Sequence, residues 1–306
     1  MANNNSLVSV FVVTYNAEEY ICETLDSIKA QTYDNIELIV SDDHSSDNTV
    51  SRVNCWINNN KERFLRTEVI TVDHNTGVSA NYNRAVRACR GEWLKNVDGD
   101  DLLYNNCIEL NVEFVKKNPD AKLVFSNVMD FSGSNPKVLL GEHIPEKNKF
   151  FFTLSAEEQF KILLHENYLP SPSCFVKAEL IRMYPYNEDY RGLEDEPMWL
   201  TLTRNGYKVY YFDVCTAYYR NGESTIYSSS RYYSPLYVES FCMLYWNDKF
   251  KYIKKYNLLE ANNTNRRTML MMDFALYFLK NKKNCFNNLL YKIAFYFVFY
   301  RISFKL

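Results

Sequence analysis

The sequence of 306 residues predicts an α/β fold in which helices pack on a mostly parallel β-sheet. Three observations lead to this prediction. β-rich runs alternate with amphipathic segments through the first hundred residues, polar residues follow directly on three of these runs, and the apolar content is sufficient for a large core. Strands separated by helices form parallel β-α-β units with right-handed crossovers. Because a single core rarely grows beyond about 250 residues, we expect one large domain and an extension.

The elements can be assigned in chain order. Residues 7–14 form a β-rich run that suits a buried strand, and residues 17–31 carry apolar side chains at helical spacing. Further strands are expected at 36–40, 67–72, 93–97, 123–126 and 208–212. Further helices are expected at 46–59, 78–89, 102–117 and 194–204, and from Ser155, which has capping-box spacing to Glu158. Gly91 is expected to cap the helix at 78–89.

The composition excludes several classes of protein. Hydrophobic residues make up 47% and charged residues 24% of the chain, which excludes a mainly disordered protein. The net charge of −2 argues against nucleic acid as a principal partner. The eight cysteines contain no C-x-x-C pair and the four histidines no H-x-x-x-H pair, so we expect no zinc knuckle and no histidine metal site.

The same features bear on the compartment. The scattered cysteines and a polar start that lacks the shape of a signal peptide indicate a reducing cytoplasm. No segment reaches the roughly 20 apolar residues that a membrane-spanning helix needs.

Polar residues end three of the expected strands, namely Thr14-Tyr15-Asn16, Asp42-Asp43 and Asp98-Gly99-Asp100-Asp101. Ligands of open parallel sheets bind outside the carboxyl ends of the strands, so these clusters are expected to meet in one crevice. The glycine pattern of a dinucleotide-binding fold and the P-loop are both absent from the sequence, which excludes those two nucleotide sites.

The segment from Asp98 to Asp101 holds three carboxylates in four residues. Like charges at this spacing raise one another's pKa unless a cation lies between them. Carboxylate oxygens select Mg²⁺ or Mn²⁺, and such an ion can neutralise a departing diphosphate. The alternative is an ordinary turn in which Asp100 or Asp101 caps the next helix. One residue could have both roles.

Two adjacent acids, Asp42 and Asp43, follow directly on a hydrophobic strand. A carboxylate at this position can accept hydrogen bonds from a base N–H or a ribose hydroxyl, and Tyr15 could stack on a flat base. The plainer interpretation is that Ser46 or Asp47 caps the next helix and that Tyr15 is a packing residue.

Together these motifs resemble an inverting family-two glycosyltransferase of the GT-A fold, of the type that builds bacterial surface polysaccharides. The resemblance covers about residues 7–225. The matching segments keep the family's order and spacing at residues 8–16, 25–33, 37–49, 75–79 with Asn83, 91–93, 98–101, 194–196 and 219–224. Two residues depart from the pattern: Val13 stands in place of a common proline, and His44 in place of the usual glycine. Neither change removes a catalytic group.

The resemblance implies a Rossmann-like catalytic domain at 1–225 and a helical, aromatic and basic extension at 226–306. Within the domain it implies a nucleotide-binding half at about 1–118 and an acceptor-binding half at about 119–225. The implied donor-binding residues are Thr14, Tyr15, Asn16, Asp43, Asn75, Asn83, Asp98 and Arg220, with Asp43 on the uracil of a UDP-sugar. Mn²⁺ or Mg²⁺ is expected on Asp100 and Asp101, and the general base is expected to be Asp195.

The implied reaction moves a hexose or N-acetylhexosamine to a hydroxyl of a saccharide acceptor, expected to be lipid-linked, in O-antigen, capsule or exopolysaccharide assembly. The hydroxyl attacks an oxocarbenium-like centre from the opposite face, and its proton passes to a carboxylate within hydrogen-bond reach. Asp195 could instead be a plain carboxylate at a helix N-terminus. Arg220, expected on the diphosphate, could instead form a surface ion pair. The loop at 167–173 could face the acceptor or be a plain connector.

Three other functions would use some of the same motifs or residues. A polyprenyl-phosphate sugar synthase would share the N-terminal motifs, but its phosphate acceptor needs no general base. A non-catalytic sugar-nucleotide-binding module is disfavoured because every expected acidic position remains acidic. A hydrolase with paired carboxylates would leave the nucleotide-site motifs unexplained.

The last segment has a charge and composition of its own. Six basic and no acidic residues follow Asp273, so the net charge of −2 leaves −8 for residues 1–273. Aromatic residues are dense in the same stretch. Cationic and aromatic side chains favour a lipid headgroup interface, so we expect this segment to dock on the inner face of the cytoplasmic membrane. The alternative is that these helices pack on the catalytic domain or on a second subunit in a homo-dimer.

Overall fold

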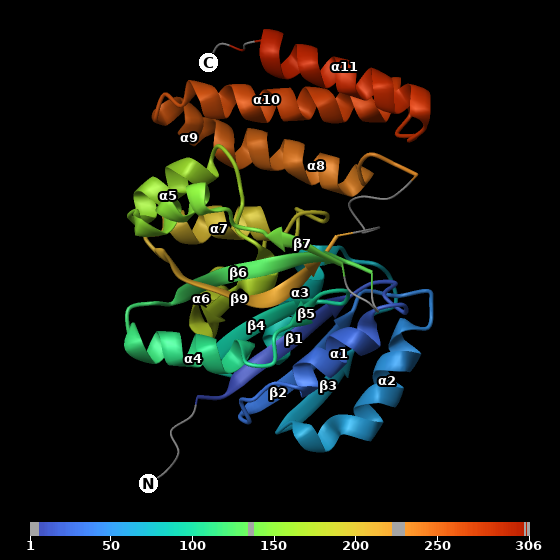
Figure 1. Cartoon of the computed structure of the whole chain (residues 1–306), viewed down its shortest axis with the longest axis vertical. Coiled ribbons are helices and arrows are strands. Elements are labelled where there is room, and N and C mark those ends of the chain that lie inside the picture. Colours follow the sequence, from blue (N-terminus) through green and yellow to red (C-terminus); the bar gives the residue numbers. More distant parts are fainter. Residues whose placement is uncertain (1–5, 134–137, 222–229, 303, 305–306) are drawn as a thin grey trace.

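The structure is a computed structural model that describes residues 6–133, 138–221, 230–302 and 304. Two sequence features, Gly222-Glu223-Ser224 and Lys305, lie outside the described residues. A nine-stranded sheet with helices on both faces forms the main body, and helices α8 to α11 are stacked beyond one face of it (Figure 1). The predicted α/β class with a helical C-terminal extension is confirmed.

The first half of the sheet is parallel. Its strands and helices alternate as β1 (Val8–Thr14), α1 (Ile21–Lys29), β2 (Ile36–Asp42), α2 (Thr49–Asn60), β3 (Arg66–Ile70), α3 (Val78–Ala88) and β4 (Trp93–Asp98), with a short 3₁₀ helix η1 (Lys61–Arg63) after α2. The strands lie in the order β3-β2-β1-β4, and all pairs are parallel. These elements confirm the predicted alternation, with ends that differ by a few residues.

Both faces of β1 are buried because successive side chains point to opposite faces of a strand. Val8, Val10 and Val12 belong to a core cluster that includes residues of α1, α2 and α4 (Cys107–Lys117). Phe11 and Val13 belong to a second cluster that includes residues of α3. This explains why β1 reads as a continuous apolar run rather than an alternating one.

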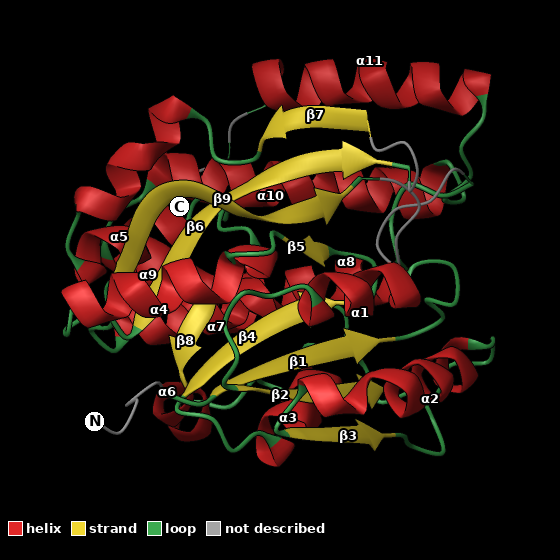
Figure 2. Ribbon diagram, turned by 60° about the horizontal axis from the view of Figure 1, so that its bottom comes forward, coloured by secondary structure: helices red, strands yellow, loops and turns green. Residues whose placement is uncertain are grey.

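The second half of the sheet is mixed. It contains β8 (Phe175–Lys177), β6 (Leu123–Ser132), β9 (Val209–Arg220) and β5 (Leu102–Leu103), with β7 (Val138–Glu142) paired to β6. β8 pairs antiparallel with β4 and β6, and β9 runs parallel to β6 (Figure 2). β6 and β9 both extend well past the predicted strands at 123–126 and 208–212, so the two strands reach the same edge as the acidic turn after β4.

The predicted helix at 102–117 is wrong at its start. Leu102 and Leu103 form β5, which pairs antiparallel with Ala217 and Tyr218 of β9, and helix α4 begins only at Cys107 (Cys107–Lys117). Since β5 separates the acidic turn from α4, neither Asp100 nor Asp101 caps that helix. The plain capping interpretation of these two acids is thereby excluded.

The prediction that Gly91 caps α3 is also wrong. The cap is Cys89 in extended conformation, and Gly91 is not among the residues with positive φ. Glycine is required there for another reason: a Cβ at Gly91 would lie 2.6 Å from Ser9 N and 2.9 Å from Leu7 O. The chain passes the start of β1 too closely for any side chain at residue 91.

The remaining helices before the extension cover the mixed half of the sheet. They are η2 (Glu146–Thr153), α5 (Ala156–Leu163), η3 (Ser171–Ser173), α6 (Ala178–Met183) and α7 (Asp195–Arg204). Ser155 caps α5 with the full reciprocal capping box to Glu158, as predicted.

The extension is a stack of helices. A continuous helix runs through α8 (Pro235–Met243), the π-helical turn η4 (Leu244–Lys249) and α9 (Phe250–Lys255), and is followed by α10 (Leu259–Asp273), the π turn η5 (Phe274–Phe278) and α11 (Cys285–Arg301). α8 lies nearest the sheet and α11 is the outermost layer (Figure 1). Within the described ranges, every helix is too short or too polar to cross a bilayer.

Candidate active site

The three polar strand ends lie side by side, as the sequence predicted. Thr14, at the end of β1, is paired with Asp42 of β2, and its neighbour Val13 is paired with Asp98 of β4. Backbone bonds continue past the strands, because Asp43 N donates to Thr14 O and Gly99 N donates to Val13 O, each at 3.0 Å. The carboxyl edge of the parallel sheet therefore carries all three clusters.

The loop after β1 is locked to the loop after β2. Asn16 has a left-handed backbone (φ +51°), its Oδ1 accepts from Ser46 N at 2.8 Å, and its N–H donates to Ser45 Oγ at 2.8 Å. His44 is also left-handed (φ +69°), which explains why a glycine is usual at this position of the pattern. Tyr15 is 40% exposed beside these bonds, so its ring is accessible to a ligand and does not belong to the core.

The start of helix α2 is closed by Asp47, one of the two residues expected to cap it. The N-cap is Asn48 and its side chain makes no capping bond, whereas Asp47 Oδ1 accepts from Thr49 N at 2.9 Å and from Thr49 Oγ1. The turn is thus closed by Asp47, one residue before the formal cap. This leaves Asp42 and Asp43 without a role in capping α2.

Asp43 is buried and is the acceptor for the loop that follows β3. Its carboxylate accepts from Thr76 N at 3.1 Å, from Gly77 N at 2.8 Å and from the Arg84 guanidinium at 2.9 Å. Arg84 thereby fixes Asp43 through an ion pair of which both side chains are mostly buried. The segment at 75–79 is brought to the strand ends by these bonds.

The two asparagines expected at the donor site have different surroundings. Asn75 Nδ2 donates to Asp43 O at 3.2 Å, which places Asn75 beside the cluster. Asn83 instead bonds to the loop before α7: its amide donates to Tyr186 O and accepts from Tyr186 N, at 2.8 and 2.9 Å. The structure thus gives Asn83 a scaffold contact, and its contact with a donor stays a prediction.

Asp101 is buried and Asp98 and Asp100 are half-buried, and the loss of solvent raises the pKa of all three carboxyl groups. The pKa of Asp98 rises to about 6, through burial and then through the charge of Asp100. Burial also raises the pKa of Asp100, and that of Asp101 rises well above its usual range because Asp100 and Asp98 add to burial. The mutual repulsion inferred from the sequence is therefore present, and a nearby cation would favour the ionised forms.

The residues of the turn fit a divalent cation. Asp101 Oδ1 accepts from Arg220 N at 2.8 Å, while Asp101 Oδ2 is buried and has no hydrogen-bond partner in the described part of the chain. A buried carboxylate oxygen without a donor matches a hard-cation ligand. The described residues form no cluster of three or more protein ligands, so any ion there would need oxygens from a bound molecule as well.

Arg220 contacts the turn through its backbone and side chain. Its Nε donates to Asp100 O at 2.7 Å, and its Nη2 donates to Glu23 at 2.7 Å. Its guanidinium lies 4.4 Å from the ring centres of both Tyr20 and Phe131. Because the Arg220 side chain is only 5% exposed, its ion pair with Glu23 is not the surface ion pair that was the alternative prediction. A bond from Arg220 to a diphosphate stays a prediction.

Asp195 is the first residue of α7. Its Oδ2 accepts from Asn167 Nδ2 at 3.2 Å and its Oδ1 from Glu196 N at 2.6 Å. Burial raises the pKa of Asp195 to about 7, with further contributions from the charges of Glu196 and Asp98. A carboxylate with this pKa can exchange a proton near neutral pH, which a plain helix-end carboxylate at its ordinary pKa could not do efficiently.

Tyr219 lies near both the acidic turn at 98–101 and Asp195. Burial raises the pKa of its hydroxyl, and the charges of Asp101, Asp98, Asp100 and Asp195 raise it further. The charges of all four carboxylates thus act on the hydroxyl of Tyr219. The strand ends and the start of α7, more than 90 residues apart in sequence, belong to one electrostatic site.

Several residues of this site were missed from the sequence. Tyr82 donates to Asp98 at 2.8 Å, Arg84 holds Asp43, and Asn167 holds Asp195. The pKa of Glu194 is raised well above its usual range, first by its own burial and then by the charges of Asp195 and Asp98. Arg84 could have been found from the sequence, because it is a charged residue between the apolar positions Tyr82, Ala85 and Val86, which are buried in α3.

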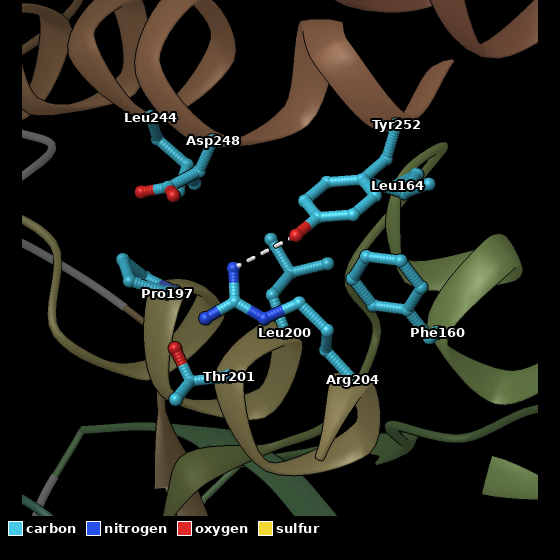
Figure 3. Close-up of a pocket in the computed structure, with 9 residues that line it drawn as sticks. All are labelled: Phe160, Leu164, Pro197, Leu200, Thr201, Arg204, Leu244, Asp248 and Tyr252. Carbon is cyan, nitrogen blue, oxygen red and sulfur yellow. Dashed lines mark hydrogen bonds between the residues drawn. The ribbon is translucent and has the colours of Figure 1, made fainter. Parts of the chain in front are cut away.

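A pocket of another kind lies outside this site. It is lined by residues of α7 and the extension, and by Phe160 and Leu164 (Figure 3). None of the sequence-predicted site residues lines it. Within it, Arg204 extends from α7 and donates to the hydroxyl of Tyr252 at 3.4 Å.

Comparison with known proteins agrees with this geometry. The model of glycosyl transferase family 2 matches residues 9–177, more than half of the chain. An uncharacterised glycosyltransferase of Methanocaldococcus jannaschii is 29% identical over 211 residues, covering 68% of this chain and 67% of that protein. The UDP-Glc:α-D-GlcNAc-diphosphoundecaprenol β-1,3-glucosyltransferase WfgD of Escherichia coli is 33% identical over 112 residues, covering 37% of this chain and 42% of WfgD.

Solved structures share the fold. Staphylococcus aureus TarS 1–349 in complex with UDP-GlcNAc superposes with a TM-score of 0.60 at 20% identity, covering 95% of this chain and 81% of that one. The mannosyltransferase PcManGT of Pyrobaculum calidifontis, in complex with GDP-Man and Mn²⁺, gives a TM-score of 0.54 at 18% identity, covering 98% and 71%. The sheet order, the strand-end cluster and the matching family model lead to one conclusion: the chain belongs to glycosyl transferase family 2 and has the GT-A fold.

Proposed function

We propose that the protein is an inverting, metal-dependent hexosyltransferase that uses a UDP-sugar. The carrying observation is that two groups of residues lie close enough for their charges to interact, the strand-end cluster at Thr14, Asp43 and Asp98 and the half-buried Asp195 at the start of α7. The first group is on the side expected for the nucleotide, and the second can receive a proton. Both are needed for transfer to a hydroxyl.

Asp195 acts as the general base in this proposal. With a pKa of about 7 it is ionised above neutral pH and basic enough to accept a proton from an attacking hydroxyl. Asn167, in the loop at 167–173, holds one carboxylate oxygen, and this contact supports that loop as the acceptor side. Attack opposite to the departing diphosphate inverts the anomeric centre.

The donor is proposed to bind at the strand-end cluster. Tyr15 is exposed for stacking on the uracil, and Asp43 is expected to hold that base, with its orientation set by Arg84. Asp100 and Asp101 would hold Mn²⁺ or Mg²⁺ through hard carboxylate oxygens. When bound, such an ion supplies charge neutralisation for the leaving diphosphate. The Mn²⁺ in the PcManGT complex supports a divalent ion for this fold.

The acceptor is proposed to be a saccharide linked to a lipid diphosphate, in the assembly of a bacterial surface polysaccharide. WfgD, which is similar over its matched part, has such an acceptor in its name. A polyprenyl-phosphate sugar synthase is the second candidate. The half-buried Asp195 with its raised pKa favours the hydroxyl acceptor over it, because a phosphate needs no base.

A panel of UDP-sugars with Mn²⁺ tests the function, each sugar offered to a diphosphate-linked saccharide and to a polyprenyl phosphate. The expected product is a glycoside on the saccharide whose anomeric configuration, read by NMR, is opposite to that of the donor. Product on the polyprenyl phosphate alone would select the second candidate. UDP binding without any product would leave a sugar-nucleotide-binding module.

We further propose a peripheral location on the inner face of the cytoplasmic membrane, through α11. Its inward stripe, which includes Leu290, Tyr291 and Val298, packs toward the rest of the protein, whereas an outward stripe stays exposed. Most exposed apolar residues of α11 recur at helical spacing and are Phe286, Leu289, Ile293, Tyr296, Phe297 and Tyr300. Phe295 is exposed as well but lies outside this spacing. Tyr300 is 72% and Phe286 67% exposed, which makes this stripe a candidate interaction surface.

The charge around this stripe matches an anionic leaflet. Lys280, Lys282, Lys292 and Arg301 are exposed on or just before α11, and no acidic residue follows Asp273. Each such cation near the surface adds about 1 kcal/mol on an anionic leaflet. A membrane partner accounts for both the aromatic stripe and its basic flanks, whereas a second copy of the chain would place like charges together.

Sedimentation with phosphatidylglycerol vesicles tests this location at low salt, with phosphatidylcholine vesicles as the neutral comparison. We expect the wild type to sediment with the anionic vesicles and Phe286→Ser/Phe297→Ser/Tyr300→Ser to remain in solution. The matched control is Leu139→Ser/Leu140→Ser, which removes exposed apolar residues of β7 and should sediment like the wild type. A wild type that stays in solution and forms dimers would assign α11 to a subunit interface.

A further inference from the structure

The segment that carries the proposed base is held by the extension. Gly192 N donates to Ser240 Oγ of α8 at 3.0 Å, and a Cβ at Gly192 would lie 2.6 Å from backbone atoms of Leu236 and Tyr237. The hydroxyl of Tyr190 donates to Asp248 of η4. The chain at 190–192 is therefore in direct backbone contact with α8, only three residues before Asp195.

A buried ion pair makes the next contact. Lys249, the last residue of η4, pairs with Glu196, and the two side chains are only 2% and 8% exposed. Asn265 of α10 gives Lys249 Nζ a further acceptor at 3.3 Å. On the same interface Leu244, Asp248 and Tyr252 face α7 (Figure 3). The helix through η4 thus lies along α7 and places the ammonium group of Lys249 at the first turn of α7.

Glu196 is also the group that most affects Asp195 after burial. Its N–H donates to Asp195 Oδ1, while its charge raises the pKa of Asp195. The other titratable groups that face Asp195 are Glu194, Asp98 of β4, Tyr186 and Tyr219. All of these are acids or phenols, so Lys249 is the cation that opposes them through its contact with Glu196.

We propose that Lys249 is a positioning residue for the general base, because its ammonium group balances the charge of Glu196 and so sets the pH at which Asp195 accepts a proton. The extension then takes part in the reaction through this one side chain, although it lies outside the segments that carry the sequence motifs. The proposal rests on the proposed role of Asp195.

Removing the charge of Glu196 and removing that of Lys249 should shift the pH at which Asp195 ionises in opposite directions. Glu196→Gln removes the anion and leaves the cation, so Asp195 should ionise at lower pH. Lys249→Met leaves the anion unbalanced, so Asp195 should ionise at higher pH. Removing a single charge this close to Asp195 is expected to shift the pH at which Asp195 ionises by about one unit. The double variant Lys249→Met/Glu196→Gln removes both charges and should return close to the wild type.

The experiment records the acid limb of kcat against pH for the wild type and these three variants, at a temperature where thermal melting shows all of them folded. Lys249→Arg keeps the charge and should have the wild-type limb. Lys122→Met, which breaks an exposed ion pair with Glu179, is the matched control and should also leave the limb in place. The KM for the donor is expected to stay within about twofold, since the pair is remote from the nucleotide side.

A second readout does not depend on transfer. The ¹³C carboxyl resonance of Asp195, identified by its loss in Asp195→Asn, is titrated in the same variants. Opposite displacements in Glu196→Gln and Lys249→Met support the proposal even if no donor is found, so its outcome is distinct from that of the proposed function. Displacements in the same direction, or none in a folded single variant, overturn it and leave the pair a purely structural contact.

Discussion

At the scale of single residues, the site works through carboxyl groups that burial keeps from ionising at their ordinary pH. Asp98 and Asp195 have pKa values of about 6 and 7, and Asp101 and Glu194 lie well above their usual range. An isolated acid of this kind would be a defect of the fold. Grouped together, these acids are proposed to hold a cation at Asp100 and Asp101 and to accept a proton at Asp195.

Replacement of Asp195 by Asn should reduce kcat by roughly 10²-fold or more and leave UDP affinity nearly unchanged, because a general base acts in the transition state. In the wild type, kcat should fall as the pH drops below about 7, where Asp195 takes up a proton. Steady-state kinetics and UDP titration measure both effects. A collapse of UDP affinity in the variant would make Asp195 a donor-binding or structural residue.

Removal of divalent ions with EDTA should abolish transfer, and added Mn²⁺ or Mg²⁺ should restore it. Asp100→Asn should lose both activity and the metal-dependent part of UDP binding, since two carboxylates and the diphosphate would share the ion. Calorimetry of UDP binding with and without Mn²⁺ gives a readout besides activity. Full activity in EDTA would contradict the role given to Asp100 and Asp101.

At the scale of elements, close backbone packing decides where the polar clusters lie. Loops at 43–48 and 75–77 are tied to β1 and β2 by carboxylate and amide acceptors, and the short strand β5 turns the acidic segment toward β9. Arg220, at the end of β9, holds Asp101 through its backbone N–H. Each cluster is thus fixed by an element from elsewhere in the chain.

Gly91→Ala tests this packing. The added Cβ would lie within 3 Å of backbone atoms of Ser9 and Leu7, so β1 or β4 must shift. We expect a loss of about 2–4 kcal/mol in the free energy of unfolding, measured by urea denaturation. Arg90→Ala changes the exposed neighbour and keeps the backbone bond to Glu37, so it should stay within about 0.5 kcal/mol of the wild type.

At the scale of the whole molecule, the extension has two different faces. The helix from α8 to α9 contacts the segment of the proposed base, whereas α11 lies at the far side of the stack with its aromatic stripe exposed (Figure 1). The domain boundary near residue 225 stays a prediction, but contacts that cross it show that residues 235–255 are packed on the catalytic core.

A chain that ends after Asn284 separates these two faces. It keeps Ser240 and Lys249 but lacks α11, so we expect UDP affinity close to that of the full chain and no sedimentation with anionic vesicles. Equal vesicle binding by the two chains would contradict the membrane proposal. Loss of UDP affinity together with a lower melting temperature would show instead that α11 is needed for the fold.

The sequence by itself determined the alternation of strands and helices, the three polar strand ends and the acid at the start of α7, because these depend on local periodicity and on the rule that parallel strands end at one edge. It misjudged Gly91 and the start of α4, since the approach of Leu7 and Ser9 and the pairing of β5 with β9 join residues far apart in the chain.

Only the tertiary structure decided the partners of the acids. Arg84, Asn167 and Lys249 contact Asp43, Asp195 and Glu196 across 28 to 53 positions of sequence. Burial, which raises the pKa of Asp98 and Asp195, likewise depends on the whole fold rather than on neighbouring residues. The residue types of the site can be identified from the sequence, but their proton affinities arise from charges and desolvation that exist only after folding.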